Sequence, residues 1–226
     1  MKEIRGILFD AGGTLIHIDG ERVCRAAGLS FAPGEFARAE AAAHAQAREW
    51  IARHPDSTDA ERLPIFVDGL LRRLKVEDGP VRAEAARRLA TEHERANLWS
   101  RPGENAAETL ETLKRRSYRL GVVSNSNGHV RGLLRHAGLA HFLEVIIDSA
   151  ELGIEKPDPR IFFAATNDLD LEPAECAYVG DIYEIDVVGA RAAGLAPILI
   201  GDCPAPEPVA RVADLLALLP LFPQAP

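Results

Sequence analysis

The chain has 226 residues, of which 47% are hydrophobic and 27% charged, and its formal net charge at pH 7 is −8. This length can bury one sizeable core and a smaller second domain, and the composition is ordinary for a soluble globular protein. The acidic balance argues against a nucleic acid or an anionic membrane surface as the main partner, and no apolar run reaches the ~20 residues of a membrane span.

The three cysteines, Cys24, Cys176 and Cys203, are an odd number without a short metal-ligand spacing. This usage is typical of reduced, mostly buried thiols in a cytoplasmic protein. The sequence starts directly in an apolar strand and shows no secretory signal. We therefore expect a cytoplasmic location.

The first predicted element is a buried strand at residues 4–9, a short β-branched run that ends at Asp10. From 17 to 96 the sequence is rich in Ala, Arg and Glu with helical spacing, and it contains no convincing strand. The predicted helices of this segment are 34–53, one that starts at the capping box 58–61, and 81–95. The segment therefore reads as an all-helical insertion.

A strict alternation of helices and strands begins after Pro102-Gly103. The predicted helices are 104–116, 129–138, 159–168 and 186–194, and the predicted strands are 118–123, 144–147, 176–180 and 196–200. Such alternation predicts right-handed crossovers and an α/β fold, a Rossmann-like parallel sheet with helices on both faces. The tail predicts one more amphipathic helix at about 207–218. We expect a core domain of 1–16 and 97–226 and a helical cap domain of 17–96.

Polar side chains follow three of the predicted strands. Asp10 follows the first strand, Ser124 and Asn125 follow 118–123, and Asp181 follows 176–180, with Asp186 in the first turn of the next helix. Open α/β sheets bind ligands at the carboxyl ends of their strands, so we expect these groups to converge. Taken singly, Asp10 could cap a turn and Ser124 could cap a helix.

Lys156 is the candidate cation for this site. It precedes Pro157, which disfavours helical backbone at the lysine, so a turn presents its side chain. An ammonium group there would stabilise negative charge on a nucleophile and on a transferred group.

These segments, in this order, resemble the haloacid dehalogenase-like (HAD) hydrolase superfamily, most of whose members are Mg²⁺-dependent phosphatases. The resemblance rests on Asp10 and its glycine turn, on Ser124, on the Lys-Pro-Asp-Pro run at 156–159, and on the Gly-Asp pair at 180–181 with Asp186. It implies that Asp10, Ser124 and Lys156 are catalytic. It also implies that Ser124, Asn125 and Lys156 bind the substrate.

The resemblance further implies a magnesium site. Its ligands would be Asp10, Asp181 and the backbone carbonyl of Gly12, with Asp186 binding directly or through water. Converging carboxylates repel unless a cation lies among them, and hard oxygen ligands suit Mg²⁺. The implied reaction is hydrolysis of a small-molecule phosphate ester through an aspartyl-phosphate, with the cap closing over the site.

One expected residue is absent. HAD phosphatases ordinarily carry a second Asp two residues after the nucleophile, where this chain has Gly12. General acid–base help is worth about 10²–10⁴ in rate, so we expect slow turnover of poor leaving groups. His17, Glu184 or a side chain of the helical segment are candidate replacements. Candidate substrate contacts in that segment are Arg22, Arg25 and Arg38, although solvated helix faces are the default for arginines.

The absent acid opens three alternatives. One is a 2-haloacid dehalogenase-like hydrolase, since those relatives also lack the second Asp and need no metal. Another is a phosphonate-cleaving enzyme, which would need Lys75 as a Schiff-base lysine. The third is a catalytically impaired phosphate- or metal-binding protein. The sequence defines neither the substrate nor the oligomeric state.

Overall fold

The computed structural model describes residues 3–76 and 79–224. The chain divides into two compact units, one made of Met1–His17 with Ser100–Pro226 and the other of Ile18–Trp99. We call them the α/β unit and the helical unit. The expected boundaries, 16/17 and 96/97, lie one and three residues from these divisions.

The α/β unit is built on a six-stranded sheet in the order β5-β4-β1-β6-β7-β8, with every neighbouring pair parallel. The strands are β1 (Gly6–Phe9), β4 (Arg119–Ser124), β5 (Val145–Asp148), β6 (Cys176–Gly180), β7 (Ala196–Ile200) and β8 (Ala210–Val212). This confirms the predicted parallel α/β sheet. The central strand β1 is buried along its whole length, as expected for a strand covered on both faces.

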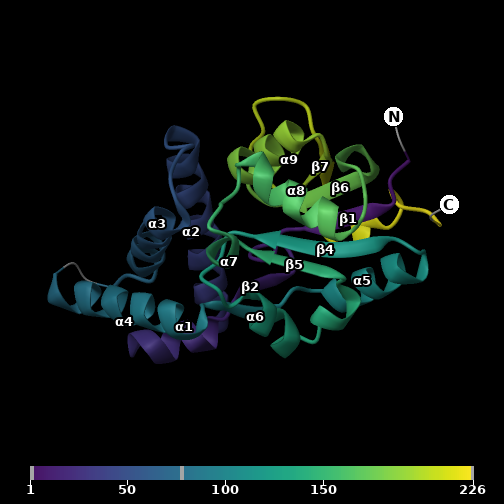
Figure 1. Cartoon of the computed structure of the whole chain (residues 1–226). Helices are drawn as coiled ribbons and strands as arrows, with labels where there is room; N and C mark the ends of the chain where they lie inside the picture. The colour runs from purple at the N-terminus through teal and green to yellow at the C-terminus, as the bar shows by residue number, and fades with distance from the viewer. Residues whose placement is uncertain (1–2, 77–78, 225–226) are drawn as a thin grey trace. The chain divides into compact units, whose positions relative to one another are not determined.

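Helices cover both faces of this sheet (Figure 1). One face carries α5 (Ala106–Arg115) and α6 (Val130–His136), and the other carries α8 (Pro159–Asp168) and α9 (Val188–Ala193). A one-turn helix, α7 (Ser149–Leu152), follows β5. A π-helical turn, Tyr183–Val187, precedes α9, so helical backbone starts three residues before the predicted 186.

The strand register determines what lies near Asp10. Phe9, the last residue of β1, pairs with Val122 of β4 and with Val179 of β6. The Asp10 backbone N–H donates to the Val179 carbonyl at 2.8 Å. Residues just beyond the ends of β4 and β6 therefore lie beside Asp10.

The predicted tail helix at 207–218 is wrong. Residues Ala210–Val212 form strand β8 beside β7, and Leu216–Leu218 form a single 3-10 turn. The Gly201 N–H donates to the Val212 carbonyl at 2.9 Å. The backbone of the tail thus pairs with the otherwise open edge of β7, a gain that outweighs the helical spacing of the leucines.

Two short strands also went unpredicted. β2 (Ile16–Ile18) and β3 (Trp99–Pro102) form a separate two-stranded sheet where the chain leaves and re-enters the α/β unit. Strands of three and four residues carry too little periodicity to be recognised in a sequence.

The helical unit contains α1 (Gly20–Ala27), α2 (Pro33–Arg53), α3 (Asp59–Arg73) and α4 (Pro80–Ala96). The predicted helices 34–53 and 81–95 are confirmed as α2 and α4. The capping box is also confirmed, since the Thr58 N–H donates to Glu61 Oε2 at 2.8 Å. Phe36, Leu70 and Leu89 belong to a core of its own. The role of this unit as a cap stays a prediction.

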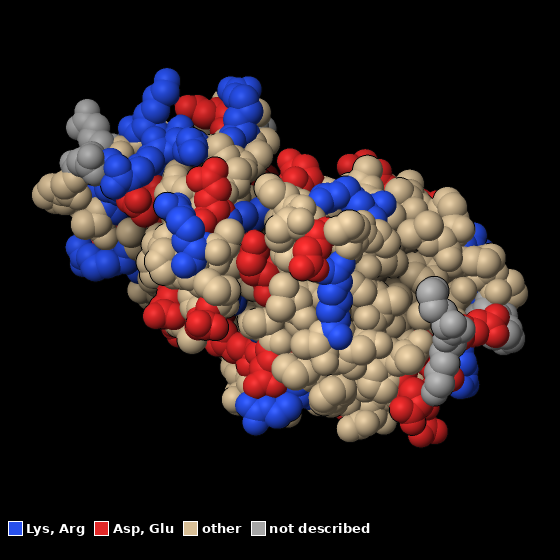
Figure 2. Space-filling model, turned by 90° about the horizontal axis from the view of Figure 1, so that it is seen from above, with Lys and Arg blue, Asp and Glu red and all other residues tan. Residues whose placement is uncertain are grey.

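Basic side chains gather on the helical unit in the view of Figure 2. Many of them pair within their own helix: Arg72 with Asp68 at 2.7 Å, and Arg87 and Arg88 with Glu84 at 2.5 and 2.7 Å. Such exposed pairs are solvated and contribute little each. Among the described residues, no helix combines the length and apolar character needed to cross a membrane.

The close packing of the central sheet can be tested at Gly121 of β4. A Cβ there would lie 2.3 Å from Val145 Cγ1 and 2.7 Å from Leu8 Cδ2. Because valine is stiff at χ1, we expect Gly121→Ala to lower the free energy of unfolding by about 1–3 kcal/mol in urea titrations. The control is Gly132→Ala in α6, where a Cβ meets nothing within 4 Å. It should raise stability by about 0.4–1 kcal/mol, and an equal loss in both variants would contradict this account.

Candidate active site

The centre of the site is the buried ammonium group of Lys156, which lies in the loop between α7 and α8. Its Nζ lies 2.6 Å from Asp10 Oδ1 and 2.8 Å from Asp186 Oδ1. The Lys156 side chain is 2% exposed, and both carboxylates are buried. Three segments far apart in the sequence thus meet in one ion-paired group at the carboxyl edge of the sheet.

Tyr178 is a member of this group that the sequence did not reveal. Its hydroxyl lies 2.8 Å from Lys156 Nζ, 2.9 Å from the Val123 carbonyl and 3.3 Å from Asp186 Oδ1. The only signal in the sequence is a tyrosine in an otherwise apolar strand, a pattern equally typical of core packing.

Asn125 fixes the backbone of the lysine. Its Nδ2 donates to the Lys156 carbonyl at 3.0 Å, and its Oδ1 accepts from the Lys156 N–H at 2.8 Å. Both ends of the Asn125 amide therefore contact the main chain of the loop, and the Lys156–Pro157 peptide bond is cis. Binding of substrate by Asn125 stays a prediction.

Ser124 is the last residue of β4 and is buried, with its Oγ 3.3 Å from the Asn125 carbonyl. It ends the strand beside β1, so it lies on the same edge as Asp10. Its catalytic role also stays a prediction.

Two glycines allow the later carboxylates to approach the backbone. A Cβ on Gly13, where φ is +84°, would lie 2.7 Å from Asp181 Oδ2. A Cβ on Gly180 would lie 2.3 Å from Asp186 Cγ. Asp181 therefore packs against the turn that follows Asp10, and only glycine leaves room for it there.

Burial dominates the electrostatics of the site. It raises the pKa of Asp10 to about 7, although Lys156 opposes the rise, and the charge of Asp186 adds to it. Burial also works against the charged form of Lys156, but Asp10 and Asp186 outweigh it and raise the pKa of the ammonium group. Burial and the same two carboxylates raise the pKa of Tyr178, whose hydroxyl therefore stays protonated.

The donor set for a metal consists of two carboxylates beside one turn. Asp10 directly precedes that turn, and Asp181 packs against Gly13, the residue that follows Gly12. Both carboxylate oxygens of Asp186 have partners within the protein: Oδ1 contacts Lys156, and Oδ2 accepts from the Ile182 N–H at 2.9 Å. Within residues 3–76 and 79–224, no group of three or more His, Cys, Asp or Glu side chains is arranged to hold a metal ion.

The charge balance nevertheless fits a divalent cation. Asp10, Asp181 and Asp186 against Lys156 sum to −2 when all four groups are ionised, and all four are buried. A divalent cation would offset the excess of negative charge among these four groups. Two carboxylates, a backbone carbonyl and retained waters are a ligand set that Mg²⁺ accepts.

His17 is a poor candidate for the replacement acid. Burial, together with the charge of Arg101, lowers the pKa of its imidazole, so less of it carries a proton at neutral pH. The candidate substrate contact Arg22 is held within the helical unit, where its Nη1 donates to the carbonyls of Ala96 and Asn97 at 3.0 and 2.7 Å.

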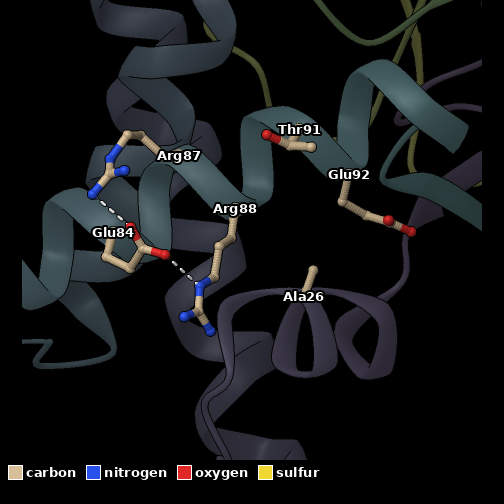
Figure 3. Close-up of a pocket in the computed structure, with 6 residues that line it drawn as sticks. All are labelled: Ala26, Glu84, Arg87, Arg88, Thr91 and Glu92. Atoms are coloured by element: carbon tan, nitrogen blue, oxygen red, sulfur yellow. Dashed lines mark hydrogen bonds and ion pairs between the residues drawn. The ribbon is translucent and has the colours of Figure 1, made fainter.

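A surface hollow of about 340 Å³ lies in the helical unit between α1 and α4 (Figure 3). Its lining residues are Ala26, Glu84, Arg87, Arg88, Thr91 and Glu92. Glu84 pairs with both arginines, as the dashed lines show, so their charges are already compensated. None of these residues was predicted to take part in chemistry, and we assign the chemistry to the strand ends.

A family model described as haloacid dehalogenase-like hydrolase matches residues 4–194, which include every side chain of the site. The chain belongs to this family. The HAD resemblance is therefore confirmed, and the protein is a HAD-like hydrolase.

The relatives of this HAD-like hydrolase include proteins named as phosphatases and as a dehalogenase. Glyceraldehyde 3-phosphate phosphatase of Methanopyrus kandleri is 32% identical over 139 residues, which cover 61% of this chain and 58% of the relative. (S)-2-haloacid dehalogenase 1 of Pseudomonas sp. strain CBS-3 is 29% identical over 215 residues, 92% of this chain and 88% of the relative.

A solved dehalogenase structure with an intermediate complex superimposes with a TM-score of 0.70 at 26% identity, covering 99% of both chains. The matches to the first two curated relatives span only 52% and 58% of their lengths. Family membership thus fixes the fold and the hydrolase class, and the substrate needs a separate argument.

Proposed function

We propose that this HAD-like hydrolase is a Mg²⁺-dependent phosphatase that acts on a small phosphorylated metabolite. The observation that carries the proposal is the contact of Asp181 with the Gly13 turn, because it brings a second carboxylate to the nucleophile's own turn. A carboxylate in that position serves a cation, whereas displacement at carbon requires none. The phosphatases among the relatives support the same choice.

In the proposed reaction Asp10 attacks the phosphorus atom. The bond between phosphorus and the leaving oxygen breaks, the leaving oxygen keeps the electron pair, and an aspartyl-phosphate forms. The leaving oxygen takes a proton from solvent. Water then attacks phosphorus and gives up a proton to solvent, the bond between phosphorus and the Asp10 oxygen breaks, and inorganic phosphate and the Asp10 carboxylate are released. Lys156 holds Asp10 in position and offsets its charge, and Ser124 lies at the adjoining strand end to donate to a phosphoryl oxygen.

Mg²⁺ bound by Asp10, Asp181 and the Gly12 carbonyl would polarise the phosphoryl oxygens and balance the charge of the site. Asp186 remains a candidate for contact with the ion through water, since its own oxygens contact Lys156 and the Ile182 N–H.

A 2-haloacid dehalogenase is the second candidate, and Gly12 favours it. There Asp10 would attack the carbon atom and expel halide, and water would hydrolyse the resulting ester. Halide leaves without a proton, so that reaction needs no general acid at position 12. The alignment with the Pseudomonas dehalogenase over nearly the whole chain supports this alternative.

The proposal is tested by phosphate release from a panel of phosphorylated metabolites and an aryl phosphate, with Mg²⁺ or with EDTA. We expect Mg²⁺-dependent release that EDTA abolishes and that Asp10→Asn eliminates. Halide release from 2-haloacids that persists in EDTA would overturn the proposal in favour of a dehalogenase. Binding of Mg²⁺ or phosphate without turnover of either class would indicate a binding protein.

The absent acid predicts a strong dependence on the leaving group. Because position 12 supplies no proton, aryl phosphates should be hydrolysed much faster than alkyl phosphates. Gly12→Asp should raise alkyl-phosphate turnover by about 10²-fold or more, with little effect on aryl phosphates. Gly12→Asn is the matched control, because it adds a side chain of similar size without an acid. Equal wild-type rates on both ester classes would show that another residue already serves as the acid.

A further inference from the structure

At position 178 the packing of the core requires an aromatic ring but no hydroxyl group. The residue is completely buried in β6, and its ring packs edge-on against Phe162 at a centroid distance of 4.9 Å. A phenylalanine would fill the same space and would bury no polar group. Since burying an unpaired hydroxyl is costly, the bonds that this hydroxyl makes decide what it does.

The directions of those bonds follow from the chemistry of the partners. An ammonium group only donates, so the Tyr178 oxygen accepts from Lys156 Nζ at 2.8 Å. The Val123 carbonyl at 2.9 Å and the Asp186 carboxylate at 3.3 Å only accept, so the single Tyr178 proton is shared between two acceptors and Val123 is the nearer one. The hydroxyl therefore links the backbone of β4, one residue before Ser124, to the Lys156 ammonium.

The ammonium group has three N–H donors and three acceptors at bonding distance. These acceptors are Asp10 Oδ1 at 2.6 Å, Asp186 Oδ1 at 2.8 Å and the Tyr178 oxygen at 2.8 Å. Two of these acceptors are carboxylates of the candidate site. The third, the Tyr178 oxygen, is neutral and belongs to a residue of β6. Removing the third would leave a buried N–H without its partner and would free Nζ to move relative to both carboxylates.

We infer that Tyr178 is a positioning residue, which holds the Lys156 ammonium at the distance from Asp10 and Asp186 that nucleophilic attack requires. It acts through Lys156 and touches no reacting atom. The inference goes beyond the proposed function, because a carboxylate nucleophile needs the same placement whether it attacks phosphorus or carbon.

The test compares Tyr178→Phe with Tyr118→Phe. Tyr118 is a buried tyrosine of the same unit whose ring packs against Phe222, and it directly precedes β4, at the opposite end of this strand from Ser124. On whichever substrate the wild type hydrolyses, Tyr178→Phe should lower kcat by about 10–100-fold and leave KM unchanged, as is typical for loss of a supporting hydrogen bond. Tyr118→Phe should leave both constants unchanged.

A spectroscopic measurement tests the same inference without turnover. The chain has only four lysines, so ¹⁵N-lysine labelling gives a simple spectrum, and Lys156→Met identifies the signal of the buried ammonium. In the wild type this signal should be sharp and protected from exchange with water. In folded Tyr178→Phe it should shift and broaden, whereas Tyr118→Phe should leave it in place.

The two measurements separate the possible failures. An unchanged Lys156 signal, or an unchanged kcat, in folded Tyr178→Phe would overturn the positioning role. A wild type without turnover on phosphate esters and haloacids would instead overturn the proposed function, and the spectrum would still decide the role of Tyr178. If Tyr178→Phe does not fold while Tyr118→Phe does, the hydroxyl is a structural requirement and the inference fails.

Discussion

The placement of one buried ammonium group between two buried carboxylates organises the whole candidate site. Lys156 Nζ contacts Asp10, which follows β1, and Asp186, which lies in the π-helical turn after β6. Such a pair is expensive to desolvate, and removal of one partner leaves an uncompensated charge. The surrounding bonds, from Asn125 to the lysine backbone and from Tyr178 to its ammonium, are consistent with a group that must stay in one place.

The sheet and the residues at its edge could be predicted from the sequence because strong local signals specify them. Buried apolar runs ending in Asp10, Ser124 and Asp181 indicate parallel strands whose chemistry lies at one edge. The strand β8 could not be predicted, since pairing with β7 is a tertiary gain that overrides the leucine spacing of the tail. Tyr178 was missed for a related reason, because only the fold brings its hydroxyl to Lys156.

Gly12 and Asp181 lead toward different reactions within one family. With glycine at position 12, no general acid is present there to protonate a poor leaving group, and this favours a dehalogenase. The Asp181 carboxylate beside Gly13 adds negative charge that a cation would compensate, and this favours a phosphatase. We weigh the second observation more heavily, because a missing acid slows phosphoryl transfer without preventing it. Asp181 is buried against Gly13, in the turn that follows Asp10, and this placement is the reason for the cation in our proposal.

The most direct test of the central interaction is a double-mutant cycle between Asp10 and Lys156, measured by urea unfolding. Lys156→Met should cost about 3–5 kcal/mol in the wild type, because it leaves both carboxylates buried without their cation. In the Asp10→Asn background the same substitution should cost less by about 1 kcal/mol or more. An equal cost in both backgrounds would show that the two side chains are not coupled, and it would contradict the site described here.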